Sequence, residues 1–564
     1  MISFHSRTMR GFGSSDELKQ FLLSAPTIEQ ILSFSTIEEE VQSNNQSLMS
    51  YLSNDHIRYL ITLITEEPLD DSNRDRAYKF PLIASLFFGT DQLTVLDFFY
   101  EDKTLLDLLF NFLNKEEDLN FLLAGYFAKA FDSLISRDCD ALLQYVFTNS
   151  FHTKMLKHLY SQSIADVIFK TVAAYNCEED YLSERLGILE ELINSLSNTN
   201  PAVAMNVEYV MEKVINDKSI NLYVALYEYL SSEAITEKIF RNLENEYTWI
   251  ARSSAKILKN LLKQYLEEIK DSGEDVPDIV GIFEKNLEFM KNTLEKPKDK
   301  KISSQFCREI EAYSEEKIIV IDILTILCTV ENYSLWKTIV SLKFIETITA
   351  HFKTYIWNST LHTAYLNLLY AILTGESEEL IQDIFNAKIP DMVLDQAIVP
   401  DEEIDGISIR KGHIGHIYKI ANLLKTARES QTVILNFFNH VEGWYEFESH
   451  VLSIYNEIES VPLGNRKSSA APNSANDIDI LQDLTQGIAF DMPSFLNQNP
   501  FDIKEVDDPM IINQLEEQGE IKSSNIFMET IPKDNTFAKL METEFMDNNF
   551  WKISKIVDEV PELG

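Results

Sequence analysis

Residues 119–135 read LNFLLAGYFAKAFDSLI, and the apolar side chains in this stretch recur at the spacing of an α-helix. Several other stretches of typical helix length show the same pattern, at 56–68, 183–196, 220–230 and 255–269. Segments with the two-residue alternation of a β-strand are nearly absent. The sequence therefore predicts an all-α protein.

The same spacing can be followed at the start of the chain. In TIEQILSF, from Thr27, a helix places Ile28, Ile31 and Leu32 on one stripe. Thr27 stands directly before that stripe, and threonine is a favoured N-cap residue because its hydroxyl accepts a free backbone N–H. We expect a capped helix here.

Helices of this number and length favour stacked pairs over a single bundle in a chain of 564 residues. No crisp repeat of fixed period is found, which favours an irregular armadillo/HEAT-like solenoid, where the repeat shows mainly as apolar spacing. The segments 316–330 and 361–373 are apolar nearly all round, so we expect them to be central helices. The charged, proline-containing run 291–304 is expected to be an exposed loop inside the array.

The domain prediction has three parts: a flexible N-terminus at 1–15, the α-solenoid at 16–458 and a mostly disordered acidic tail at 459–564. The tail holds 20 acidic and 8 basic residues with isolated aromatic residues between them. Such a composition cannot bury enough apolar surface to offset the entropy of ordering the chain.

The charge balance limits the partners. With 90 acidic against 49 basic residues, the formal net charge is −41, which disfavours binding to nucleic acid phosphates and to anionic membranes. The N-terminus has no apolar signal core, and no apolar run is long enough to span a bilayer. The four cysteines lie far apart without a CxxC pair, so we expect neither a zinc ribbon nor a disulfide framework. We expect a soluble cytoplasmic protein, with the nucleus as a second location.

Catalytic signatures are absent from the sequence. It contains no GxxxxGK[ST] phosphate loop, no HExxH zinc helix and no GxSxG nucleophile elbow. The metal-binding Gly-Asp-x-His and Gly-Asn-His-Glu motifs of serine/threonine phosphatases are also missing. The glycine-rich GFGSS at Gly11 lacks a third glycine and a preceding strand, so it does not indicate a nucleotide site. We predict a protein that is not an enzyme and needs no cofactor.

The stretch 410–424, RKGHIGHIYKIANLL, is unusual because two basic residues and two glycines precede a helix. Gly412 and Gly415 could permit close helix packing or a tight entry turn. Arg410 and Lys411 could instead hold an anion together with free backbone N–H groups at the helix start.

A metal site is the third interpretation of this stretch. His413 and His416 are three residues apart, so a helix could bring them to one face. A third ligand would have to come from carboxylates that read as a flexible loop: Asp401, Glu402, Glu403 and Asp405. The packing interpretation is favoured over the metal.

A second unusual stretch is FKTYIWNSTLHTAY, at 352–365. Trp357 reads as a core anchor, and Asn358 as a cap for the helix that starts near Leu361. Two polar helix entrances about fifty residues apart could lie on one edge of a solenoid, where loops form binding surfaces.

Several segments in fixed order resemble the SAPS-domain family, the regulatory subunits of protein phosphatase 6 and its fungal equivalent. The earlier ones are TIEQIL (27–32), NNQSLMSYL (44–52), LITEEP (63–68), RAYKFP (76–81), LNFLLAGYFAK (119–129) and SIADVI (163–168). The most specific ones are YIWNSTLHT (355–363), RKGHIGHIYKIAN (410–422) and WYEF (444–447). Together they extend over roughly residues 16 to 450.

The resemblance implies a non-catalytic regulatory and targeting subunit that binds a phosphatase 6-type serine/threonine phosphatase catalytic subunit and directs it to substrates. A third, scaffold subunit would be compatible with this. The alternatives are a general α-solenoid adaptor or transport scaffold, and a metal hydrolase centred on the two histidines. We expect the phosphatase-binding surface to include Trp357, Asn358, His362, Arg410, Lys411, His413 and His416.

Overall fold

The computed structural model describes residues 14–460 apart from short gaps at 69–73, 90–91, 175–180, 221, 270–277, 297–300, 304–308, 398–401 and 405–406. The chain divides into two compact units, Met1–Lys467 and Ser468–Gly564, and all described residues belong to the first. The predicted acidic tail therefore lies outside the described residues except for its first two positions. Of the predicted flexible N-terminus, only the last two positions are described.

The described part of the chain is built almost entirely of helices, which confirms the predicted all-α, solenoid-like architecture. Its N-terminal portion consists of α1 (Ser14–Leu23), α2 (Ile28–Leu32), α3 (Ile37–Gln42), α4 (Gln46–Tyr51), α5 (Asn54–Thr65), η1 (Asp75–Lys79), α6 (Phe80–Phe87), α7 (Leu93–Glu101), α8 (Lys103–Phe110) and η2 (Asn111–Asn114). The predicted Thr27 cap is present: the Thr27 hydroxyl accepts the Gln30 N–H, and the Gln30 side chain accepts the Thr27 N–H.

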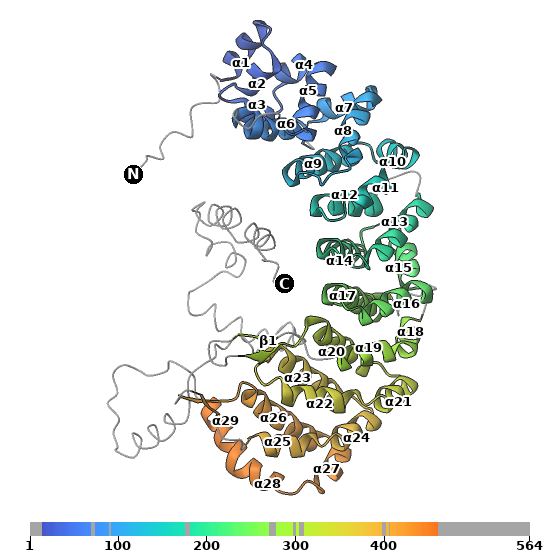
Figure 1. The fold of residues 1–564 in the computed structure, drawn as a ribbon, viewed down its shortest axis with the longest axis vertical. Coiled ribbons are helices and arrows are strands. Elements are labelled where there is room, and N and C mark those ends of the chain that lie inside the picture. Colours follow the sequence, from blue (N-terminus) through green and yellow to red (C-terminus); the bar gives the residue numbers. More distant parts are fainter. Residues whose placement is uncertain are drawn as a thin grey trace, which may run out of the picture. The chain divides into compact units, whose positions relative to one another are not determined.

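Longer helices then follow one another side by side and form what we call the main row (Figure 1). They are α9 (Phe121–Arg137), α12 (Gln162–Ala173), α14 (Pro201–Asn216), α17 (Thr248–Gln264), α20 (Glu315–Cys328), α23 (Ser359–Thr374) and α26 (Ile414–Ser430). α20 and α23 are the two segments predicted to be central, and both bury residues on several sides.

Other helices pack against the main row or against one another beside it (Figure 1). They are α10 (Cys139–Thr148), α11 (Phe151–Lys157), α13 (Leu182–Ser195), α15 (Tyr223–Ser231), α16 (Glu233–Arg241), η3 (Asn242–Glu244), η4 (Tyr265–Ile269), α18 (Ile279–Lys285), α19 (Leu287–Glu295), α21 (Tyr333–Ser341), α22 (Phe344–Thr354), α24 (Glu378–Asn386), α25 (Ile389–Ala397), α27 (Thr432–Phe438), α28 (Trp444–Phe447), η5 (Glu448–Leu452) and α29 (Ser453–Glu459). One contiguous apolar core runs from Leu18 to Leu452.

Two expectations about loops are wrong. The run 291–304 is not a single exposed loop, because α19 continues to Glu295 and buries Thr293 and Leu294. β1 (Lys301–Ile302) then pairs with β2 (Ile310–Glu311). The carboxylate-rich segment read as a flexible loop contains an antiparallel pair, β3 (Glu402–Ile404) with β4 (Ile407–Ile409).

The cysteine prediction also fails at one position, since Cys139 is disulfide-bonded.

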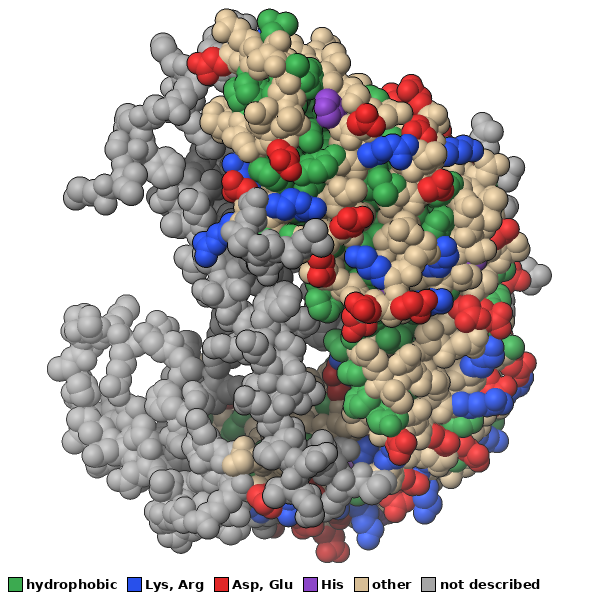
Figure 2. All heavy atoms as spheres, turned by 45° about the horizontal axis from the view of Figure 1, so that its top comes forward, with side chains coloured by type: hydrophobic (Ala, Val, Ile, Leu, Met, Phe, Trp, Pro, Cys, Tyr) green, Lys and Arg blue, Asp and Glu red, His purple; other side chains and the backbone are tan. Residues whose placement is uncertain are grey.

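Ion pairs connect successive helices of the main row. In three of these pairs the earlier helix supplies the carboxylate and the next helix the basic side chain: Asp132–Lys170 (2.5 Å), Asp166–Lys213 (3.0 Å) and Glu208–Arg252 (2.9 Å). In Lys259–Asp322 (2.7 Å) the earlier helix supplies the lysine and the next helix the carboxylate. On the face in Figure 2, acidic and basic side chains are interspersed, with hydrophobic ones between them. Partly exposed pairs of this kind stabilise a protein by about 0–1 kcal/mol each, so their larger effect is to fix the register between helices.

Candidate functional site

The two helix entrances that stood out in the sequence lie against each other, at the start of α23 and the start of α26. A Cβ built on Gly412 would lie 2.7 Å from the Ile356 carbonyl oxygen and 2.9 Å from Cε3 of Trp357. Real Cβ atoms do not approach other atoms so closely, so the contact needs a residue without a side chain. Gly415 is different, because nothing lies within 4 Å of its Cβ position. The packing interpretation therefore holds for Gly412 and is wrong for Gly415.

The start of α23 is capped as predicted. The Asn358 side chain accepts the Leu361 N–H at 2.8 Å, and the helix begins at Ser359. This cap fixes the chain direction directly after Trp357, which is half-buried in place of the fully buried core anchor expected from the sequence. The capped turn and Gly412 together hold the two entrances in one arrangement.

Three histidines gather beneath this contact. The His362 ring centroid lies 5.3 Å from that of His416 and 6.0 Å from that of His413. His362 and His413 are fully buried, and His416 is half-buried. Each Nε2 has one polar neighbour: the Tyr355 carbonyl oxygen for His362 (3.0 Å), the Gln396 Oε1 for His413 (3.1 Å) and the Thr363 Oγ1 for His416 (3.3 Å).

The three imidazoles are neutral at physiological pH. Burial, together with the neighbouring His416 and His413, lowers the pKa of His362 to about 3. Burial likewise lowers the pKa values of His413 and His416 to about 4, with contributions from the charges of Lys411 and Lys419. Because a carbonyl oxygen can only accept, His362 carries its proton on Nε2 and donates it to Tyr355.

This arrangement offers little to a metal or an anion. Across the described residues, no group of three His, Cys, Asp or Glu side chains is placed to hold a metal ion. At the start of α26, the Ile414 N–H already donates to the Lys411 carbonyl, and the N–H groups of His416 and Ile417 both donate to the His413 carbonyl. Few backbone donors are left for an anion, so the histidines contribute packing and hydrogen bonding between α23 and α26.

The predicted contact residues therefore divide into two groups. His362 and His413 are enclosed, and their side chains cannot themselves reach a partner. The second group is half-buried, so solvent reaches part of each side chain: Trp357, Asn358, Arg410, Lys411 and His416. Arg410 and Lys411 make no ion pair with any residue that the structure describes, so both cations are available to a carboxylate from outside. A partner contact at this site stays a prediction and rests on these two side chains with Trp357.

The sequence reasoning did not find the polar partners of the histidines or the ion pairs between the main-row helices. Gln396 lies on α25, and nothing in its local sequence relates it to His413. The ion pairs had a weak signal, because acidic and basic residues recur on the exposed faces of successive helices. Within the described part of the chain, no helix is long and apolar enough to cross a membrane.

Comparison with known proteins gives related findings. Residues 335–461 match the family model described as SIT4 phosphatase-associated protein, SAPS. The chain is 27% identical over 173 residues to serine/threonine-protein phosphatase 6 regulatory subunit 2 of Mus musculus, covering 30% of this chain and 18% of that protein. It is 21% identical over 449 residues to regulatory subunit 3-B of Xenopus laevis, covering 71% of this chain and 52% of that protein.

The aligned segments thus span about half or less of the length of these relatives. Among solved structures, importin beta is similar over 78% of this chain and 54% of its own, with 11% identity and a TM-score of 0.41. The matched family region contains both helix entrances and all three histidines. The resemblance inferred from the sequence motifs is confirmed by these matches.

Proposed function

We propose that the chain, whose residues 335–461 match the SAPS family model, is a non-catalytic regulatory subunit that binds a phosphatase 6-type serine/threonine phosphatase catalytic subunit and directs it to substrates. The observation that carries the proposal is the match of this region to the SAPS family, together with relatives named as phosphatase 6 regulatory subunits. An array of stacked helices suits this role, because it presents a long, fixed surface to a folded partner.

The two half-buried cations beside Trp357 are part of the proposed contact. Arg410 and Lys411 directly precede Gly412, at the junction that Gly412 and Asn358 hold in place. An unpaired surface cation next to a half-buried tryptophan has the composition of a binding surface, where aromatic and basic residues are enriched. We expect the partner to place a carboxylate here.

The test is direct binding of the purified full chain to a phosphatase 6-type catalytic subunit, measured by size-exclusion chromatography and by calorimetry. We expect a one-to-one complex whose association slows as salt rises, because a net charge of −41 steers basic surfaces toward the protein. Lys411→Glu should weaken the complex several-fold. Lys157→Glu is the matched control, since Lys157 is exposed on α11 and pairs with no described residue. A folded chain that does not bind would leave the general adaptor as the better function.

A further inference from the structure

The contact at Arg410 and Lys411 is too small to hold an enzyme domain by itself. Specific interfaces bury about 800 Å² on each partner, some 20 to 30 residues a side. Two of the predicted contact residues, His362 and His413, contribute no surface at all. If the proposed function holds, the phosphatase needs further surface on the main row.

The helices α9, α12 and α14 have a known register. A Cβ on Gly125 of α9 would lie 3.9 Å from the Ser163 hydroxyl of α12, and one end of the same helix pair is joined by Asp132 and Lys170. From the first contact to the second, the residue number rises by seven on both helices, so α9 and α12 are parallel. On the other side of α12, Asp166 accepts a hydrogen bond from the Tyr209 hydroxyl of α14 at 2.6 Å.

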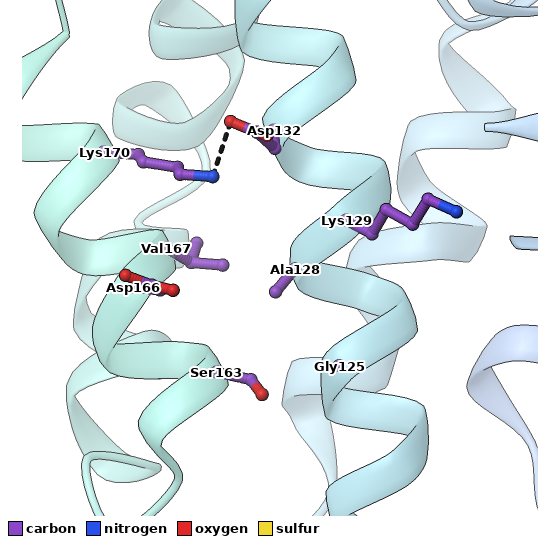
Figure 3. A pocket seen from close by; sticks show the side chains of 8 residues that line it. All are labelled: Gly125, Ala128, Lys129, Asp132, Ser163, Asp166, Val167 and Lys170. Carbon is purple, nitrogen blue, oxygen red and sulfur yellow. Dashed lines mark ion pairs between the residues drawn. The ribbon is translucent and has the colours of Figure 1, made fainter. Parts of the chain in front are cut away.

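A groove lies between α9 and α12. It has a volume of about 290 Å³, and Gly125 and Ala128 in its lining leave the space that larger side chains would fill. The rest of its lining is Val167 with five polar or charged side chains: Lys129, Asp132, Ser163, Asp166 and Lys170. In Figure 3, Ala128 and Val167 point toward each other across the groove, Ser163 points toward Gly125, and the Asp132–Lys170 pair closes one end. This volume is at the lower limit of small-molecule sites, which suits one inserted side chain of a protein partner better than a separate ligand.

Exposed apolar side chains flank the groove. Leu122, one helical turn before Gly125 on the same face of α9, is 46% exposed. Met205 on α14 is 49% exposed and stands one turn before Tyr209, so it lies toward the same end of the three helices. Apolar residues gathered around a depression are typical of the centre of a protein–protein interface.

Lys129 gives the surface its charge preference. Its side chain points away from α12 and from Lys170 (Figure 3). It forms no ion pair with any described residue, whereas Lys170 and Lys213 on the next two helices of the row are both paired. Partial burial of its stem lowers the pKa of the Lys129 ammonium. A cation that is partly desolvated and unpaired is best satisfied by a carboxylate from a partner.

We propose that the surface formed by the α9–α12 groove, Leu122, Met205 and Lys129 is a second contact surface for the phosphatase catalytic subunit. This inference rests on the proposed function. The partner inserts a small polar side chain into the groove, because Ser163 and the charged side chains of its lining favour a hydrogen-bonding group, and it sets a neighbouring carboxylate on Lys129. The flanking apolar residues exclude water around the inserted side chain, and the ion pairs between helices keep the groove at a fixed width.

The test uses the full chain and a purified phosphatase 6-type catalytic subunit in a calorimetric titration. Gly125→Leu fills the groove from a position whose Cβ makes only an ordinary contact. Gly187→Leu is its control, because Gly187 is an exposed helical glycine on α13 with nothing within 4 Å of its Cβ position. Lys129→Glu reverses the charge, with Lys157→Glu as the control. We expect the first member of each pair to weaken binding at least tenfold and each control to bind like the wild type.

The outcomes separate the two proposals. If the wild type binds and both Gly125→Leu and Lys129→Glu bind equally well, the second surface is refuted while the regulatory function stands. If the folded wild type does not bind, the proposed function fails and this inference with it. If circular dichroism shows that Gly125→Leu is misfolded, Lys129→Glu decides alone, because it changes an exposed side chain.

Discussion

Replacing Gly412 by alanine tests the junction between the two helix entrances. The added Cβ would lie 2.7 Å from the Ile356 carbonyl oxygen and 2.9 Å from Trp357 Cε3. The first of these is a backbone atom, so it cannot rotate away. Gly415 is the matched position three residues later, in the first turn of α26, where a Cβ meets nothing within 4 Å.

The two substitutions are expected to change the free energy of unfolding in opposite directions. Forcing a methyl group into a packed contact costs about 1–3 kcal/mol of unfolding free energy. A Gly→Ala change whose backbone conformation is acceptable stabilises by roughly 0.4–1 kcal/mol, because the unfolded chain has fewer conformations to lose. Gly412→Ala should therefore lose about 1–2 kcal/mol, while Gly415→Ala should be neutral or gain up to about 1 kcal/mol.

The assay has to be local, because a long repeat array need not unfold in one step. Hydrogen exchange read by mass spectrometry should show faster exchange in peptides covering 355–363 and 410–422 for Gly412→Ala, with α9 unchanged as an internal reference. Gly415→Ala should leave these peptides as protected as in the wild type. Equal protection in the two variants would show that the junction is not tightly packed and would refute the reasoning.

Two further predictions concern the same region. Because the folded-state pKa values of His362 (about 3) and His413 (about 4) lie below the usual 6.5, the unfolded chain binds more protons below that pH. The stability present above pH 6.5 should fall by about 1.4 kcal/mol per histidine per pH unit down to about pH 4. Hydrogen exchange of the peptides covering 355–363 and 410–422, corrected for the intrinsic exchange rate at each pH, should show this loss between pH 7.5 and 5, less steeply in His413→Gln. Asn358→Ala removes the cap of α23 and should cost about 1 kcal/mol of local stability, read from hydrogen exchange of the peptide covering 355–363 at pH 7.5, and Asn358→Asp should restore most of it. Unchanged exchange in the alanine variant would mean that the cap contributes nothing.

The sequence predicted the features that depend on local chemistry. The caps at Thr27 and Asn358 follow from side chains that accept nearby N–H groups, and both are present. The sequence left several interpretations of Gly412 open, because the close contact that requires a glycine is made with a loop some fifty residues earlier in the chain. No local rule could separate Gly412 from Gly415.

The hairpin of β3 and β4 was missed although its signal was available. Asp405–Gly406 separates the two strands, and Asp-Gly between short apolar segments is a strong two-residue hairpin signal. The structure pairs Ile404 with Ile407, the two residues that flank this dipeptide in the sequence. Acidic residues in the first strand drew the interpretation toward a loop, which shows that charge is a weaker indicator of structure than turn chemistry.

The motifs that carried the family resemblance contain residues that the structure places in the core. His362 and His413 are fully buried, and so is Trp444 of the WYEF segment, which follows Gly443 in a left-handed conformation (φ 78°). A buried side chain is constrained by its neighbours, so resemblance at such positions identifies how α23, α26 and α28 pack. It does not identify the atoms that meet a partner. Those have to be sought among side chains that solvent reaches and that make no ion pair with a described residue, such as half-buried Lys411 and exposed Lys129. Charge reversal at these two lysines therefore tests binding, while substitution of the histidines tests only folding.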